Sequence, residues 1–395
     1  MPCKKIKPLL MGCLWVSAAL THSVQAEESP DALMAALTGG KVNASFRLRY
    51  ETVDDDVPLL KDAEALTLRS IVGYTTGELA GFSAVIEFED VRVVGGVDDY
   101  APEQLGYSVI ADPEETRLNR GFVQYQGIEN LTLAAGRQRI AYDNQRFIGN
   151  VGWRQNEQTF DSFTSVWNAG DVTVQYAFVN QVNGVMPVLD ADVEDHFLNV
   201  SWTGLSFVTV TGYGYYLEQD NTHTENDTVG MRMAGSSALN DSLKLIYTAE
   251  YAQQETNHFN ADYRLGELGI GMGPVTVKAG YETLGSDNGV YGFQTPLGTK
   301  HAFNGWADKF LVTPVAGLED TYLDVTADAL GMTWKAVYHE FNSDKGNIDY
   351  GNEVDVMVSK AFGKHYVLGV KYATYDADAF SVDTDKFWLW GELKF

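Results

Sequence analysis

The chain has 395 residues, and its 28 lysines and arginines against 54 aspartates and glutamates give a formal net charge of −26 at pH 7. So acidic a chain is not a nucleic-acid-binding protein, because phosphate contacts need a basic surface. No long apolar run follows the N-terminal segment, yet the chain has 21 tyrosines, 19 phenylalanines and 8 tryptophans. This combination excludes a helical membrane protein and suits short alternating strands that end in aromatic girdles.

Residues 1–26 have the pattern of a secretory signal peptide. A basic stretch (4–7) precedes a short apolar segment (9–20), and Val-Gln-Ala at 24–26 offers a cleavage site. A membrane-spanning helix is the poorer alternative, because the apolar segment is shorter than about 18 residues. Lipoprotein processing at Cys13 is a second alternative, since the residues before it faintly resemble a lipobox. We therefore expect an exported protein of a Gram-negative bacterium.

The cysteines, Cys3 and Cys13, both lie in this N-terminal segment. After its removal we expect no disulfide, no thiolate metal site and no cofactor. The acidic residues gather in segments that we expect to be solvated loops. The alternative is that divalent cations bridge these loops to anionic lipid headgroups. The acidic segments are 54–56, 98–99, 112–115, 190–195 and 383–385.

Strict alternation of apolar and polar residues begins at Lys41, after a segment (27–40) that we expect to form a helical turn in the periplasm. From Val42 to Glu51 the alternation persists for about ten residues, the length that a tilted strand needs to cross a bilayer. The pattern recurs along the chain and predicts about eighteen strands, with sixteen or twenty as alternatives. After the first, they are predicted near 64–75, 81–92, 116–126, 130–141, 158–168, 171–181, 194–203, 206–218, 227–237, 241–253, 260–271, 274–284, 320–328, 331–342, 352–361, 365–376 and 386–395.

Connection lengths support a barrel. Every second connection is tight, whereas those between them are longer, above all 93–115, 142–157 and 285–319. Short turns at one rim and long loops at the other are typical of outer-membrane barrels. The last strand is amphipathic and ends on Phe395, as the closing strand of such a barrel does.

These patterns predict an all-β fold: a membrane-spanning antiparallel up-and-down β-barrel over 41–395, with short periplasmic turns and long extracellular loops. The predicted location is the cell outer membrane, so the partners are outer-membrane lipid and, through the C-terminal strand, the barrel-assembly machinery. Monomer and trimer both fit the sequence.

Charged side chains follow the parity that faces away from lipid, so we expect them to line the lumen. A closed, packed core could not hold so many charges, because unpaired burial costs several kcal/mol per ion. We therefore expect a water-filled lumen or one plugged by polar loops. Arginines on neighbouring strands would select carboxylates or phosphates; the alternative is that the charges pair across the wall and keep the barrel round. The candidate lining residues on strands are Arg47, Arg49, Arg69, Arg120, Arg232, Lys278, Glu87, Glu89 and Glu282.

Segment 136–161 is denser in arginine and amide groups than any other, which suits a loop folded into the lumen that meets polar or sugar-like solutes. Arg137 and Arg139 share their parity with the apolar Leu133, and this parity would place both in lipid at a cost of roughly 2–4 kcal/mol. We expect a bulge near Gly136 to turn both inward. The alternative is that both lie above the lipid.

The long connection 285–319 is too apolar and aromatic to lie solvated outside, so it is expected to be an inward plug or an extracellular lid. It contains His301, with Asp308 seven residues on but no nucleophile motif beside it. His339 is expected inward, alone and structural. We therefore do not expect an enzyme.

Three motifs resemble the alginate-export family of outer-membrane proteins, a porin-like branch common in marine proteobacteria. They are GKVNASFRLRYE at 40–51, GRQRIAYDNQRFIGNVGWRQNEQTFD at 136–161 and TPLGTKHAFNGWADKFLVTPVAGLEDTY at 295–322. The resemblance spans essentially the whole chain after the signal segment. It implies an eighteen-stranded channel and, for founding members, an arginine-lined path for an anionic polysaccharide. The arginines within the matching motifs are Arg47, Arg49, Arg137, Arg139, Arg146 and Arg154.

The sequence therefore predicts a porin for passive diffusion of small polar or anionic solutes through a charged lumen. The alternative is an export pore for an anionic, alginate-like polysaccharide. A structural or adhesive barrel is a third possibility, although it would not need so many opposed inward charges.

Overall fold

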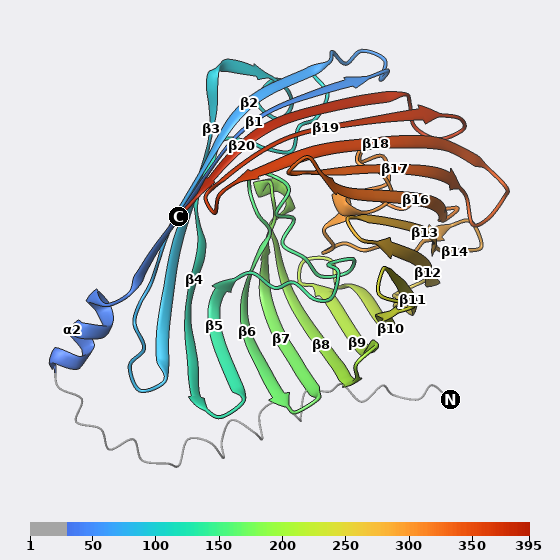
Figure 1. Cartoon of the computed structure of the whole chain (residues 1–395). Coiled ribbons are helices and arrows are strands. Elements are labelled where there is room, and N and C mark those ends of the chain that lie inside the picture. The colour runs from blue at the N-terminus through green and yellow to red at the C-terminus, as the bar shows by residue number, and fades with distance from the viewer. Residues whose placement is uncertain (1–29) are drawn as a thin grey trace.

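The computed structural model describes residues 30–395, and the predicted signal peptide, with its two cysteines, lies outside them (Figure 1). Helix α2 (Pro30–Thr38) precedes a single antiparallel sheet of eighteen strands. Strand β1 pairs with β2 on one side and with β20 on the other, so the sheet closes into a barrel. The predicted fold class and strand number are confirmed.

The barrel strands have the following bounds: β1 (Lys41–Asp55), β2 (Ala63–Thr75), β3 (Phe82–Asp99), β4 (Glu115–Ile128), β5 (Leu131–Gln138), β6 (Thr159–Ala169), β7 (Val172–Asn183), β8 (Ala191–Leu205), β9 (Val208–Gln219), β10 (Thr224–Ala238), β11 (Leu243–Thr256), β12 (Asn260–Met272), β13 (Val275–Leu284), β16 (Leu318–Ala329), β17 (Met332–Asn342), β18 (Asp349–Phe362), β19 (Tyr366–Ala377) and β20 (Thr384–Lys394). Four short elements lie in connections: η2 (Pro187–Leu189), β14 (Ser286–Asp287), β15 (Tyr291–Gly292) and η3 (Lys300–Ala302). None of the helices in the described range is long and apolar enough to cross a membrane.

Alternating side chains face opposite sides of the wall, as the sequence pattern predicts. In β2, Ala65, Thr67 and Arg69 are buried inside the barrel, whereas Val72, on the other parity, is half exposed. The predicted loop 93–115 is too long, because β3 continues to Asp99 as a hydrogen-bonded partner of β2.

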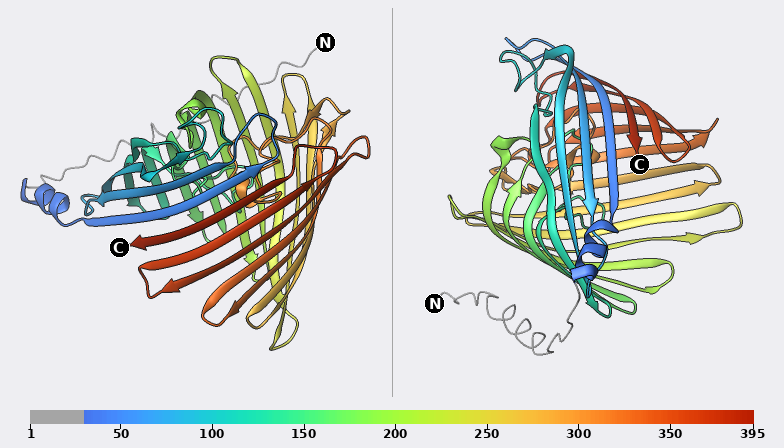
Figure 2. Two further views of the ribbon diagram at one scale, coloured as in Figure 1. Left: turned by 90° about the horizontal axis from the view of Figure 1, so that it is seen from above. Right: turned by 90° about the vertical axis from the view of Figure 1, so that its left-hand side faces the viewer.

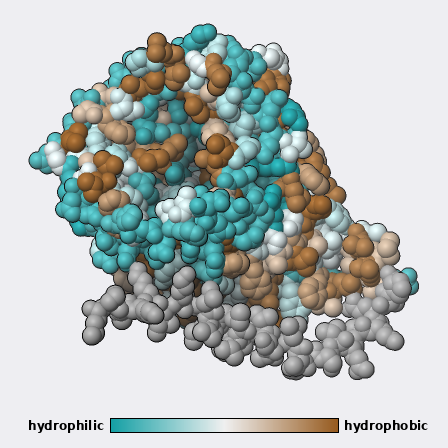
Figure 3. All heavy atoms as spheres, turned by 180° about the vertical axis from the view of Figure 1, so that it is seen from behind, coloured by the Kyte–Doolittle hydropathy of each residue, from teal (hydrophilic) through white to brown (hydrophobic). Residues whose placement is uncertain are grey.

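The two ends of the barrel differ. Helix α2 and the C-terminus lie at the end that carries the short turns, which is the periplasmic rim of such barrels (Figure 2). The opposite end carries the long connections, and there the surface is hollowed and ringed by hydrophilic residues (Figure 3).

Candidate functional site

Two long connections fold into the barrel interior instead of extending outward (Figure 1). We call residues 139–158 loop A and residues 285–317 loop B. The loops bond directly to each other: Gly149 N donates to Leu297 O at 2.9 Å, and Thr299 N donates to Gln145 O at 2.9 Å. They therefore form one interlocked plug. This agrees with the inward position expected for 136–161 and favours the inward plug over the extracellular lid for 285–319.

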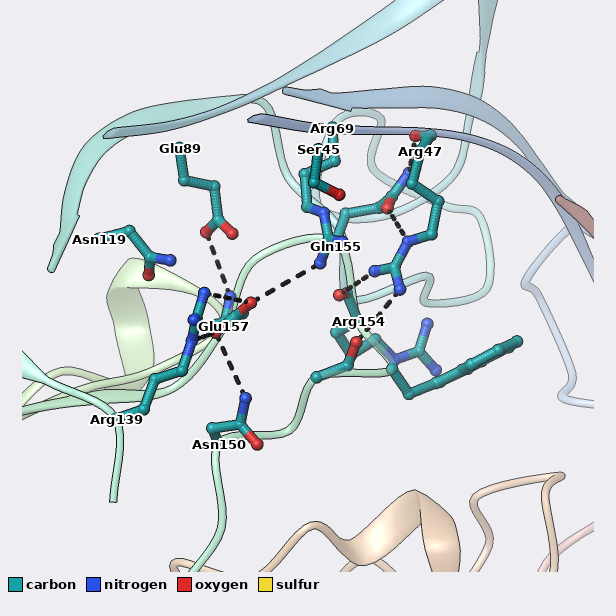
Figure 4. Close-up of polar contacts among 12 residues, drawn as sticks. Ser45, Arg47, Arg69, Glu89, Asn119, Arg139, Asn150, Arg154, Gln155 and Glu157 are labelled. Atoms are coloured by element: carbon teal, nitrogen blue, oxygen red, sulfur yellow. Dashed lines mark hydrogen bonds and ion pairs between the residues drawn. The ribbon is translucent and has the colours of Figure 1, made fainter. Parts of the chain in front are cut away.

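Arginines of β1 hold loop A against the wall. Arg47 Nε donates to Gln155 Oε1 at 2.8 Å, and Arg47 Nη1 donates to the Gly152 carbonyl at 3.1 Å. Arg49 Nη1 donates to the Trp153 carbonyl at 2.6 Å. Figure 4 shows Arg47 pointing from the wall into the loop. A guanidinium presents several donors in a fixed fork, so each arginine fixes a stretch of loop backbone.

Arg69 of β2 extends this arginine cluster along the wall. Its guanidinium lies 3.2 Å from Glu392 of β20 and 3.8 Å from Glu157 of loop A. Arg49 in turn pairs with Glu51, at 3.2 Å, and with Asp112. Each of these arginines is nearly fully buried, and carboxylates or carbonyls surround the cluster, which offsets the cost of desolvating the cations.

Arg154 joins the two loops to the wall. Its Nη1 donates to Glu51 Oε1 at 2.9 Å, and its Nη2 donates to Asp308 Oδ2 of loop B at 2.8 Å. Asp308 also accepts from Lys386 Nζ of β20 at 3.1 Å. Although burial opposes ionisation, these cations and His301 hold the pKa of Asp308 well below its ordinary value.

His301 of η3 links Asp308 to β19, the strand next to β20. Its Nε2 lies 2.7 Å from Lys371 Nζ of β19, so Nδ1 is the nitrogen that donates to Asp308, at 2.7 Å. The imidazole stacks on Trp153 of loop A, with ring centroids 5.1 Å apart. Burial, together with the neighbouring Lys371, lowers the pKa of His301 to about 3, although Asp308 acts in the opposite direction. His301 is therefore neutral and acts as a contact between loops and wall.

On the far wall, Arg146 anchors the tip of loop A. Its Nε donates to Glu282 Oε1 of β13 at 2.9 Å, and its Nη2 donates to Asn304 Oδ1 of loop B at 2.8 Å. Phe147 packs beside it against Tyr213 and Tyr263, with ring centroids 5.3 Å away in each case. The plug is thus held by aromatic packing as well as by ion pairs.

Other lumen charges form ion pairs along the wall that are less deeply buried. Arg120 Nε of β4 donates to Glu87 Oε1 at 2.9 Å, and Arg139 Nη2 donates to the same oxygen at 2.9 Å. Further pairs join Arg232 to Glu250, Lys278 to Glu267 at 3.3 Å and Lys335 to Asp324 at 3.2 Å.

In each of these wall pairs the cation is more exposed than the carboxylate. The Arg120 side chain is 23% exposed and that of Arg139 is 29% exposed, against 1% for Glu87. The exposed fractions of the cation and the carboxylate are 13% and 1% for Arg232 with Glu250. They are 32% and 14% for Lys278 with Glu267, and 31% and 18% for Lys335 with Asp324. A solute in the lumen therefore meets cationic groups, although each pair is close to neutral overall.

The structure places every candidate lining residue inside the barrel except Arg137. This side chain lies on the outer face, where its Nε and Nη2 donate to Asp161 at 2.7 and 2.9 Å. The expected register change near Gly136 is wrong for Arg137, because the β4–β5 pairing continues unbroken through Gly136 to Arg137. Arg139 does turn inward, because β5 ends at Gln138 and the chain enters loop A.

Outside the wall, Arg137 and Asp161 border a groove of about 560 Å³ in which Leu118, Phe163 and Phe178 supply apolar walls. Arg137 Nη1 also donates to the Leu118 carbonyl at 3.3 Å. The bidentate ion pair and this carbonyl offset the cost of an arginine on the lipid-facing side.

The lumen is plugged by polar loops, which is one of the two states expected from the sequence, and several charges beside the plug are fully buried. Glu89, Glu353 and Asp355 have no exposed surface, and Lys371 is almost as deeply buried. Burial is tolerated because partners are present: Glu353 accepts from Ala307 N at 2.6 Å, and Asp355 from Trp306 N at 3.2 Å. Glu89 accepts from Arg117 Nη2 at 3.0 Å.

Two further expectations are corrected. Asp112, expected in a solvated acidic loop, is fully buried and accepts from Gln155 N at 2.7 Å. His339, expected to be alone, lies 2.9 Å from Asp320 and 3.8 Å from Asp355. Sequence reasoning also missed Glu157, Gln155 and Lys371 as plug contacts. For the first two, their place inside the arginine-rich segment was the available signal.

Two comparisons connect this geometry to known proteins. The sequence matches the profile of the family described as alginate export over residues 38–281. No curated protein sequence matches the chain.

Among solved structures, OccK9 (OpdG) of Pseudomonas aeruginosa superimposes with a TM-score of 0.71 at 14% identity, over 91% of this chain and 100% of its own. OccAB4 of Acinetobacter baumannii gives a TM-score of 0.70 at 13% identity, over 90% and 98% of the two chains. The outer membrane protein OpdK of Pseudomonas aeruginosa gives a TM-score of 0.69 at 13% identity, over 90% of this chain and 99% of its own. At these identities the likeness concerns the fold.

Proposed function

This chain belongs to the alginate-export family, and we propose that it is an outer-membrane porin through which small polar or anionic solutes diffuse passively. The proposal rests on one observation above all: the wall ion pairs present their cations to the lumen and keep their carboxylates behind. Cations that line a channel attract anions and raise their local concentration.

The plug defines what kind of solute this arrangement suits. Loops A and B bond to each other and to strands on both sides of the barrel, so they narrow the lumen. The arginines of β1 and β2 are occupied by loop carbonyls and carboxylates, for example Arg47 by Gly152 and Arg49 by Trp153. They do not form a free track along which a polyanion would slide. Small solutes suit such a lumen better than a polymer.

An export pore for an anionic polysaccharide is the second candidate, and the description of the family favours it. In that case the two loops would have to leave the lumen when the polymer passes. The bonds between Arg154, Asp308 and Lys386 are then the contacts that must break.

Liposome swelling distinguishes the two candidates. Vesicles that contain the refolded protein are mixed with glucose, glucuronate or alginate oligomers of increasing length, and their swelling rates are compared. A small-solute porin passes glucuronate faster than glucose and passes oligomers progressively more slowly with length. Entry of long oligomers at the rate of the monomer would contradict the proposal and favour the export pore.

A further inference from the structure

Helix α2 has an uncovered apolar face at the periplasmic rim. Leu33, Met34 and Leu37 are 50%, 56% and 47% exposed, so about half of each residue is left uncovered by residues 30–395. Their spacing of i, i+1 and i+4 places them on one side of the helix. Asp31 is acidic and lies at the edge of this apolar face, three residues before Met34. The helix is therefore amphipathic, with its apolar side turned away from the barrel.

The helix is fixed to the barrel and is not a loose tail. Its buried contact is Ala36, whose carbonyl accepts from Gly77 N, in the β2–β3 turn, at 2.8 Å. Tyr74 OH of β2 donates to the Leu37 carbonyl at 2.7 Å and accepts from Gly40 N at 2.9 Å. A side chain at Gly40 would overlap Tyr74 OH, so the close approach requires glycine there.

Tyr74 shows on which side of the wall the helix lies. It shares its parity in β2 with Val72, which is half exposed on the outer face, whereas the alternate residue Ile71 is buried inside. Since Tyr74 bonds to both ends of the link between α2 and β1, the helix lies beside the outer face and not across the lumen. Figure 2 shows it projecting beyond the wall at the short-turn end.

We propose that α2 is an interfacial anchor whose apolar face enters the periplasmic leaflet of the outer membrane. The occupant of the face is the acyl-chain region of the phospholipids, because the face continues the lipid-facing row that ends at Tyr74. Amphipathic helices of this kind lie in the plane of the interface, with their apolar side buried about 5–10 Å deep. The inference rests on the barrel spanning the membrane and does not depend on which solute it passes.

The charge of the helix specifies how it binds. Pro30–Thr38 has no basic residue, and its charged side chain is Asp31. Insertion is therefore driven by burial of apolar surface and not by attraction to anionic headgroups. Since α2 leads directly into β1, which closes the barrel against β20, the anchor holds one end of the closing seam at the membrane surface.

Fluorescence quenching tests this directly. In the full chain with Cys3→Ser and Cys13→Ser, Met34→Cys and Ala35→Cys are each labelled with an environment-sensitive fluorophore and reconstituted in phosphatidylcholine vesicles. Ala35 is the matched control, because it is also exposed but points about 100° further round the helix. We expect a blue-shifted Met34 label, quenched several-fold more by nitroxide-bearing lipids than the Ala35 label. We also expect this difference to survive 1 M salt.

Equal quenching of both labels by aqueous iodide, with no effect of nitroxide lipids, would overturn the proposal and leave a periplasmic protein as the occupant of this face. Dependence of the quenching on anionic lipid or low salt would also contradict it. Both labelled proteins should conduct like the unlabelled protein, because α2 lies outside the lumen. This control establishes that each variant has folded.

Discussion

Arg154 of loop A and Asp308 of loop B lie 2.8 Å apart, Nη2 to Oδ2, although they are 154 positions apart in the chain. Both side chains are buried, and each also bonds to the wall, Arg154 to Glu51 and Asp308 to Lys386. This pair therefore connects the plug to the barrel seam, where β1 meets β20.

Replacing Arg154 should loosen the plug. Arg154→Met leaves Asp308 and Glu51 buried with fewer partners, and breaking a buried pair on one side costs about 3–5 kcal/mol. We expect noisier single-channel currents and faster proteolysis of loops A and B. Lys394→Met is the control. Lys394 is 60% exposed at the rim, so its replacement should change neither the current noise nor the rate of proteolysis. An Arg154→Met channel as quiet and as protected as the wild type would show that this pair does not hold the plug.

Acid should also release the plug, through His301. Its pKa is about 3 in the folded protein, below the ordinary value of 6.5, so the docked loops favour the neutral imidazole. The contribution to docking is complete above the ordinary pKa and is lost as pH falls towards about 3. We expect loop movements, seen as current fluctuations, to increase from about pH 7 to about pH 4.5. His301→Gln cannot titrate, so an equal response of this variant would refute the role of His301.

Lys300, beside Arg146, should make anion preference depend on pH in the alkaline range. Burial, and then repulsion by Arg146, lowers the pKa of Lys300 to about 8, and its side chain makes no ion pair within residues 30–395. It is charged below about pH 8 and neutral above it. We expect the preference for chloride to weaken between about pH 7 and about pH 9. In Lys300→Met this change should be absent; the same pH profile in both proteins would exclude Lys300 as its source.

Arg137 and Asp161 should matter for the wall and not for selectivity. Arg137→Leu leaves Asp161 on the outer face without its cation and with only the Asn183 amide as a donor, so we expect the free energy of unfolding in urea to fall by about 2–4 kcal/mol. The double variant with Asp161→Leu should recover most of this loss, because the outer face is then apolar. A double variant no more stable than the single one, or an altered ion preference in Arg137→Leu, would contradict the outward placement.

Much of the fold follows from period-two alternation alone, because each strand must present one face to lipid and one to the lumen. Alternation also predicts that Arg47, Arg49 and Arg69 point inward. It cannot say what these side chains meet there, since Gln155 and Glu157 reach them from a loop with no periodicity. The arginine-rich segment indicated that these residues enter the lumen, but which arginine each one contacts could not be predicted from the sequence.

Arg137 and Asp112 show why local rules fail in the remaining cases. Alternation placed Arg137 outside, and the cost of a charge in lipid argued against that position; Asp161, 24 positions away, removes the conflict by pairing with it. Asp112 belongs to an acidic run that suggested solvent, yet Arg49 and Gln155 enclose it. In both residues a distant partner, invisible in the local sequence, decides the environment.

The reversal potential under a KCl gradient shows whether the lumen presents cations to the solute. The refolded protein in a planar bilayer should prefer chloride over potassium. Arg120→Gln with Arg139→Gln should reduce or reverse that preference, because Glu87 is then uncovered. Arg264→Gln, which removes a 63% exposed side chain from the outer face, should leave it unchanged. A wild-type channel that prefers potassium, or a double variant with unaltered preference, would show that these arginines do not set the ion preference of the lumen.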